Sequence, residues 1–121
     1  MNRVCKVSED GGHIINSHGG RPGSDIGQYD VPRHLAVDDN EFVYVADRYN
    51  HRVTLLSSTL GYIRQVVSPT RHQLLWSPRR MCLDVQRRRL YVSDSEYKDD
   101  EDDEEVYACY SNAGRVLVFT V

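Results

Sequence analysis

The chain has little of what a membrane protein, a disulfide-rich secreted protein or a zinc knuckle needs. None of its apolar stretches approaches the roughly 20 residues of a membrane span, and Met1–Lys6 lacks the apolar core of a signal peptide. The three cysteines, Cys5, Cys82 and Cys109, are widely spaced and form no Cys-x-x-Cys pair. This pattern predicts reduced, packed thiols, and it favours a cytoplasmic location without membrane contact.

Helical periodicity is also missing. In a chain of 121 residues, no long segment carries apolar side chains at helical spacing. Valine, tyrosine and leucine instead cluster in short runs bounded by Gly, Pro, Asn, Asp and Ser, a pattern that predicts many short strands. The apolar fraction of 40% is sufficient for a packed core, so one ordinary all-β domain is expected.

Charge is distributed unevenly, and lysine is scarce. Thirteen of the 15 basic residues are arginine, which favours bidentate pairing with carboxylates and phosphates. Residues 94–105, here called the acidic insert, hold nine acids and one lysine. Like charges repel one another, so the insert is predicted to be a solvated surface loop. It lacks the glycine and the ligand spacing of an EF-hand, so no calcium site is expected.

An internal repeat organises the expected strands. Pro32–Asp38 and Phe42–Asp47 recur as Pro78–Asp84 and Leu90–Asp94, at an offset of 46 residues before the turn and 47 after it. A third element occurs three times, as Arg3–Val7, Arg52–Leu56 and Arg115–Phe119. A period in the upper forties with four short strands per unit is typical of a β-propeller.

The repeat divides the chain into three segments. Residues 1–18 hold the last two strands of a preceding blade, 19–68 an inter-blade loop and one complete blade, and 69–121 an incomplete blade with the acidic insert. The expected strands are 3–8, 13–18, 34–38, 43–47, 51–57, 62–68, 80–84, 89–93 and 114–120. Central strands apolar on both faces suit a sheet between two neighbours. The predicted fold class is all-β, a partial β-propeller of about two four-stranded antiparallel blades.

The complete unit resembles the NHL-repeat family. The resemblance rests on Pro32–Asp38, on Val43–Val53 and above all on the Asp-x-x-Asn-x-Arg pattern of Asp47, Asn50 and Arg52. An aspartate that ends one strand and an arginine that opens the next can bridge a tight turn. Asn50 suits the left-handed conformation that such a turn often needs.

The second unit departs from this motif, because the acidic insert begins at Asp94 and moves the matching Arg115 far along the chain. The resemblance implies a closed ring of about six blades. The chain is therefore expected to be part of a longer propeller, with the remaining blades as its first partners.

Candidate partner-binding residues lie where a blade begins and where its second strand meets its third. The resemblance places both regions towards one face of the propeller, which some relatives use to bind single-stranded RNA. Arginine and tyrosine suit phosphate contacts and base stacking, although such arginines can also tie loops together between blades. The candidates are Arg33, His34, Arg48, Tyr49, Arg79 and Arg80.

The resemblance implies binding without catalysis. The expected function is an NHL scaffold that presents loops to a protein or to single-stranded RNA, as the target-recognition part of a tripartite-motif ubiquitin ligase. The alternative is a zinc-dependent peptidyl-α-hydroxyglycine amidating lyase, a relative in which a zinc histidine directly follows the blade-starting proline. Here Arg33 holds that position and His34 comes one residue later, which turns its side chain to the other face of the strand. No catalytic residue, metal or cofactor is expected.

We predict that the acidic insert is dispensable for folding. Replacing Glu96 to Glu105 with an Asn-Gly turn should leave the thermal unfolding midpoint unchanged or raise it, because the replacement removes self-repulsion. Circular dichroism melts of the two chains test this, and a large drop in the midpoint of the shortened chain would contradict it.

Overall fold

The computed structural model describes residues 2–67, 77–94 and 115–121. Apart from Asp94, the acidic insert lies outside these ranges, so the expectation for it stays a prediction. The elements are β1 (Arg3–Val7), β2 (Ile14–Gly19), β3 (Arg21–Pro22), β4 (Gln28–Tyr29), β5 (Pro32–Val37), β6 (Val43–Asp47), the 3-10 helix η1 (Arg48–Asn50), β7 (Arg52–Leu56), β8 (Tyr62–Val67), β9 (Pro78–Asp84), β10 (Arg89–Asp94) and β11 (Arg115–Thr120). No helix in these ranges is long and apolar enough to cross a membrane.

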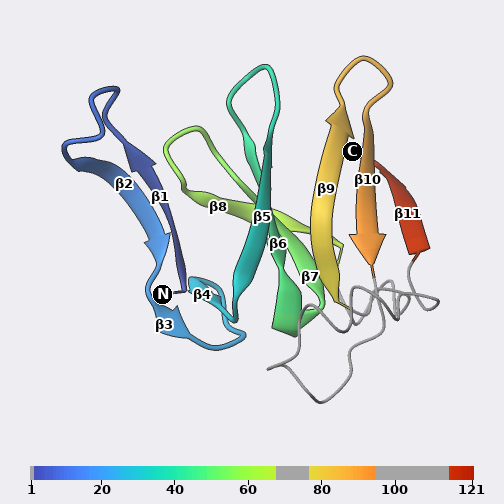
Figure 1. Ribbon diagram of the computed structural model, residues 1–121, viewed down its shortest axis with the longest axis horizontal. Coiled ribbons are helices and arrows are strands. Elements are labelled where there is room, and N and C mark those ends of the chain that lie inside the picture. The colour runs from blue at the N-terminus through green and yellow to red at the C-terminus, as the bar shows by residue number, and fades with distance from the viewer. Residues whose placement is uncertain (1, 68–76, 95–114) are drawn as a thin grey trace.

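Three antiparallel sheets stand side by side in sequence order (Figure 1). The central sheet has the order β5-β6-β7-β8, with β1-β2 on one side and β9-β10-β11 on the other. All nine expected strands are present, with bounds that differ from the expected ones by at most two residues, and the all-β class is confirmed. Two short strands were not expected: β3 and β4 form a parallel pair inside the inter-blade loop.

The two inner strands of the central sheet, β6 and β7, are buried on both faces, as their two-sided apolar pattern predicted. On the face towards β9 and β10, Tyr44 and Ala46 pack in one cluster with Met81, Leu90 and Val92. On the opposite face, the intervening residues of β6 pack with Val4 of β1 and Tyr29 of the loop. Because side chains alternate along a strand, one strand supplies both clusters, and the sheets therefore stack as propeller blades do.

The hairpin β1–β2 repeats the geometry of β7–β8. In the first hairpin the carbonyl of Ser8 accepts from the N–H of Gly11 at 2.8 Å, and in the second the carbonyl of Ser57 accepts from the N–H of Leu60 at 2.9 Å. Gly11 and Leu60 both have positive φ, 70° and 65°. The two loops thus begin with similar turns, although the first loop is one residue longer. The assignment of β1 and β2 to a preceding blade stays a prediction.

Burial between sheets should dominate stability. Leu90 is fully buried between the second and third sheets, whereas Val118 on β11 is exposed. We expect Leu90→Ala to lower the free energy of unfolding by about 2–5 kcal/mol through lost contacts and a cavity, and Val118→Ala to change it by less than about 0.5 kcal/mol. Urea unfolding followed by circular dichroism measures both, and equal losses would show that the stacking seen here does not hold in solution.

Candidate functional site

A buried polar cluster lies at the end of β6, centred on Asp47. Its carboxylate accepts hydrogen bonds from the Asp30 N–H at 2.7 Å, the Asn50 side-chain amide at 2.8 Å and the Arg52 Nε–H at 2.9 Å. Burial raises the pKa of Asp47, while these hydrogen bonds and the charge of Arg52 oppose that rise. The predicted bridge between the aspartate and the arginine is thus present, and it is buried.

The same cluster holds the inter-blade loop against the sheet. The guanidinium of Arg52 donates to the carbonyls of Ser24 and Gln28, each at 2.6 Å. The Asn50 amide donates to the carbonyl of Gly23, also at 2.6 Å. These three bonds fix the loop on both sides of its turn, and they account for the parallel pairing of β3 with β4.

The left-handed residue of the β6–β7 turn is His51, with φ 54°, so the prediction for Asn50 is wrong. The chain passes from Asp47 through η1, and the His51 N–H closes that turn on the Arg48 carbonyl at 3.3 Å. The side chain of Asn50 is instead occupied by the two hydrogen bonds to Asp47 and Gly23.

The aspartate contact is repeated in the third sheet. Asp94 is buried at the end of β10, and its carboxylate accepts from the Ser77 N–H at 2.6 Å, as Asp47 does from Asp30. Along the backbone, Asp94 lies opposite Arg115 in the β10–β11 register. The second unit therefore keeps both the aspartate contact and the opposed positions of the aspartate and the arginine. Most of the acidic insert lies between these two residues in the sequence.

Two of the candidate arginines occupy matched β-bulges. The pairing of β5 with β6 shifts register at Arg33, and the pairing of β9 with β10 shifts at Arg79. Bulges redirect side chains at the end of a strand. Arg33 and Arg80 are exposed there, and Arg79 is half-buried.

Arg48 is buried, although its position in a turn and its choice as a binding candidate implied an exposed side chain. Only 1% of it is exposed, and its Nε–H donates to the Ser77 hydroxyl at 3.3 Å. Its guanidinium carbon lies 4.9 Å from the centre of the Tyr49 ring. The side chain reaches from η1 towards the start of β9, so Arg48 links the central sheet to the third sheet.

His34 also joins neighbouring sheets. Its Nδ1 accepts from the backbone N–H of Met81 at 3.1 Å, which links β5 to β9. In the part of the chain that the structure describes, no three His, Cys, Asp or Glu side chains converge as metal ligands would. That hydrogen bond from Met81 occupies Nδ1 of His34.

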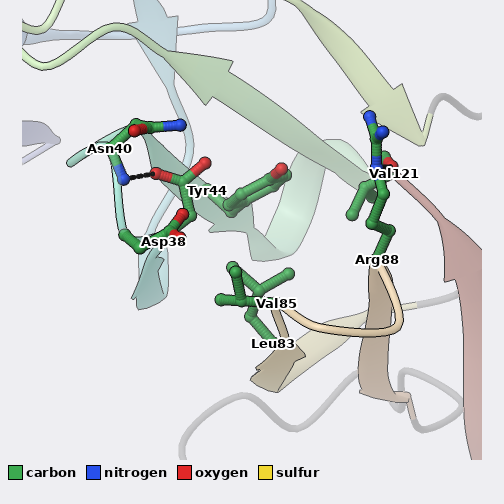
Figure 2. Close-up of a pocket in the computed structure, with 8 residues that line it drawn as sticks. Asp38, Asn40, Tyr44, Leu83, Val85, Arg88 and Val121 are labelled. Carbon is green, nitrogen blue, oxygen red and sulfur yellow. Dashed lines mark hydrogen bonds between the residues drawn. The ribbon is translucent and has the colours of Figure 1, made fainter.

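A polar cavity that the sequence did not predict lies at the opposite end of the sheets. It measures about 370 Å³ between the β5–β6 and β9–β10 turns. Figure 2 shows Asp38 and Asn40 on one side and Arg88 on the other. The Asp38 carboxylate accepts from the N–H groups of Asn40 and Phe42, each at 2.9 Å, and Arg88 donates to the Val121 carbonyl at 3.1 Å. Asp38 thus stabilises the β5–β6 turn, and Arg88 holds the end of the segment that follows β11. The sequence pattern predicts only turn residues here.

The Asp47 cluster should be a main determinant of stability. Asp47→Asn leaves the Arg52 charge buried without its counterion, so we expect a loss of about 3–5 kcal/mol in the free energy of unfolding. Asp84→Asn is the matched control, because the Asp84–Arg87 pair is exposed and contributes little. The measurement is chemical denaturation of the three chains; comparable losses in both variants would refute a special role for the cluster.

Comparison with known proteins addresses the motif directly. Residues 30–54 match the family model for the NHL repeat, and this range contains Asp47, Asn50 and Arg52. The comparison with curated proteins gave no match. The matched range runs from the loop residue bound by Asp47 into β7, which covers the whole buried cluster except the loop carbonyls. The resemblance to the NHL repeat that the motif predicted is therefore confirmed for residues 30–54.

Proposed function

We propose that the chain is a binding module that recognises a protein partner through the end of the sheets where β5 and β9 begin. This surface, here called the strand-entry end, comprises Arg33, Tyr49, Arg79 and Arg80. An NHL repeat in a stack of antiparallel sheets is typical of a β-propeller interaction scaffold. The proposal includes that the chain binds its partner without catalysing a reaction and that it is located in the cytoplasm.

The matched bulges carry the proposal. Two neighbouring sheets place an arginine at the same structural position, Arg33 in β5 and Arg79 in β9, and Arg80 adds a further exposed guanidinium. Beneath them, the buried contact from Arg48 to Ser77 fixes the two sheets relative to each other. Guanidinium groups on a rigid support favour carboxylates presented by a partner.

Two more specific hypotheses about the function follow from the family resemblance. One is the target-recognition part of a tripartite-motif ubiquitin ligase, in which this surface would select the protein to be modified. The other is single-stranded RNA as the ligand, for which Arg33 and Arg80 would contact phosphates. The protein reading is preferred, because Arg48 is buried and Tyr49 already packs near its guanidinium, which leaves fewer groups for phosphates and bases.

A charge-matched pair of variants tests the strand-entry end. Arg33→Ala with Arg80→Ala removes two exposed charges from this surface, and Arg87→Ala with Arg89→Ala removes two from the opposite end. We expect the first variant to lose partners captured by proximity labelling in cells and the second to keep them. Equal loss in both variants would mean that net charge, and not this surface, drives capture.

Binding to fluorescent oligouridine distinguishes an RNA ligand from a protein partner. Each phosphate neutralised contributes about 0.7 to the slope of log affinity against log salt for single strands. We expect weak binding whose slope is the same in the parent chain and both variants. A steep slope that flattens only in the Arg33 and Arg80 variant would overturn the protein reading in favour of RNA.

A further inference from the structure

The polar cavity between the β5–β6 and β9–β10 turns contains a hydroxyl group that the fold does not use. Tyr44 lines this cavity, and only 6% of the residue is exposed. Its hydroxyl makes no hydrogen bond within the part of the chain that the structure describes. In Figure 2 the ring extends from the side of Asp38 towards the side of Arg88. Because buried polar groups are normally paired, the Tyr44 hydroxyl is placed to bind a ligand in the cavity.

Charges of both signs surround this hydroxyl. Burial raises the pKa of Tyr44 and the Asp38 carboxylate adds to the rise, whereas Arg64 and Arg88 oppose it. The hydroxyl therefore keeps its proton at neutral pH, and it can donate a hydrogen bond as well as accept one. Asp38 and Asp39 make one wall of the cavity acidic, and Arg88 makes another wall basic.

The charged groups on the two walls keep atoms that the fold leaves unpaired. Both turn hydrogen bonds of Asp38 go to Oδ1, so its Oδ2 has no partner among the described residues. Arg88 donates through Nε to a backbone carbonyl, and its two terminal nitrogens have no partner in the same ranges. Asp38 and Arg88 also form no ion pair with each other there. The two charges thus stand apart on the walls of one cavity.

The rest of the lining is apolar and the space is small. Leu83 is half-buried against the cluster that contains Tyr44, and Val85 is exposed beside it. A volume of about 370 Å³ is near the lower end of the range for small-molecule sites. A simple anion would be repelled by Asp38, and a simple cation would be repelled by Arg88. A small ligand that carries both charges would be attracted by both walls.

We propose that this cavity binds a small zwitterion of the amino-acid class, a free α-amino acid or a dipeptide with an apolar side chain. Its ammonium group donates to Oδ2 of Asp38. Its carboxylate accepts from the terminal nitrogens of Arg88, in the bidentate manner that guanidinium groups favour, and from the Tyr44 hydroxyl. Its apolar side chain contacts Leu83 and Val85. The site lies at the opposite end of the sheets from the strand-entry arginines, so its test does not depend on the proposed function.

The probes are L-leucine and L-alanyl-L-leucine, each compared with its N-acetylated form and its C-terminal amide. Acetylation removes the ammonium charge and amidation removes the carboxylate, while the apolar part is kept. Amide chemical shifts of the isotope-labelled chain give the dissociation constants. We expect at least one zwitterion to bind saturably, and about tenfold more tightly than either of its modified forms, because each modification removes a charge-assisted hydrogen bond. The tighter of the two zwitterions distinguishes a free amino acid from a dipeptide as the ligand.

Variants of the two walls give a crossed test. Asp38→Asn keeps an oxygen for the turn hydrogen bonds, and it should abolish the preference for the zwitterion over its acetylated form. Arg88→Gln should abolish the preference over the amide. Tyr44→Phe removes only the hydroxyl and should weaken binding about threefold or more. Tyr62→Phe is the matched control, because Tyr62 packs against the other cluster and should leave binding unchanged.

Three results would overturn the proposal. They are the absence of saturable shifts with both zwitterions, equal affinity for a zwitterion and its two modified forms, and equal effects of Tyr44→Phe and Tyr62→Phe. Thermal melts of each variant separate a loss of binding from a loss of fold. Where the melting midpoint of a variant falls, the comparison of the modified probes on the parent chain decides, because it changes no residue.

Discussion

The ion pair between Asp47 and Arg52 is the interaction on which the rest of this structure depends. The two residues end β6 and open β7, so the pair closes the turn between the central strands of the blade. Both side chains are buried, and each also binds backbone groups of the inter-blade loop. Because a buried charge is tolerated only when it is fully paired, one carboxylate and one guanidinium fix the turn, the loop and the entry to the blade together.

Repetition explains why the strands could be predicted from the sequence. Each expected strand was supported by a second copy of its residue types about one period away, and the apolar residues on both faces of β6 matched the two clusters found there. Local signals also located the Asp47–Arg52 bridge, since both residues lie within one turn of each other. In these cases the contacts that form the structure join residues close together in the sequence, or they recur in each repeat.

The features that could not be predicted depend on contacts between segments far apart in the sequence. Arg48 looked like an exposed turn residue, and its burial follows from Ser77 in the next sheet. The β3–β4 pairing follows from carbonyls captured by Arg52. The binding candidates were predicted from residue type and position, and the structure separates the exposed Arg33 and Arg80 from the buried Arg48.

The contact between the strand-ending aspartate and the backbone that leads into the same sheet has a further consequence. Asp47 holds the N–H of Asp30, two residues before Pro32, and Asp94 holds that of Ser77, directly before Pro78. One residue has been gained or lost between the contact and the proline, while the two donor–acceptor distances, 2.7 and 2.6 Å, hardly differ. The carboxylate thus acts as an anchor that absorbs insertions and deletions. Loops between blades can therefore vary in length and sequence, and with them what the surface recognises, while the aspartate contact at the entry to each sheet is kept.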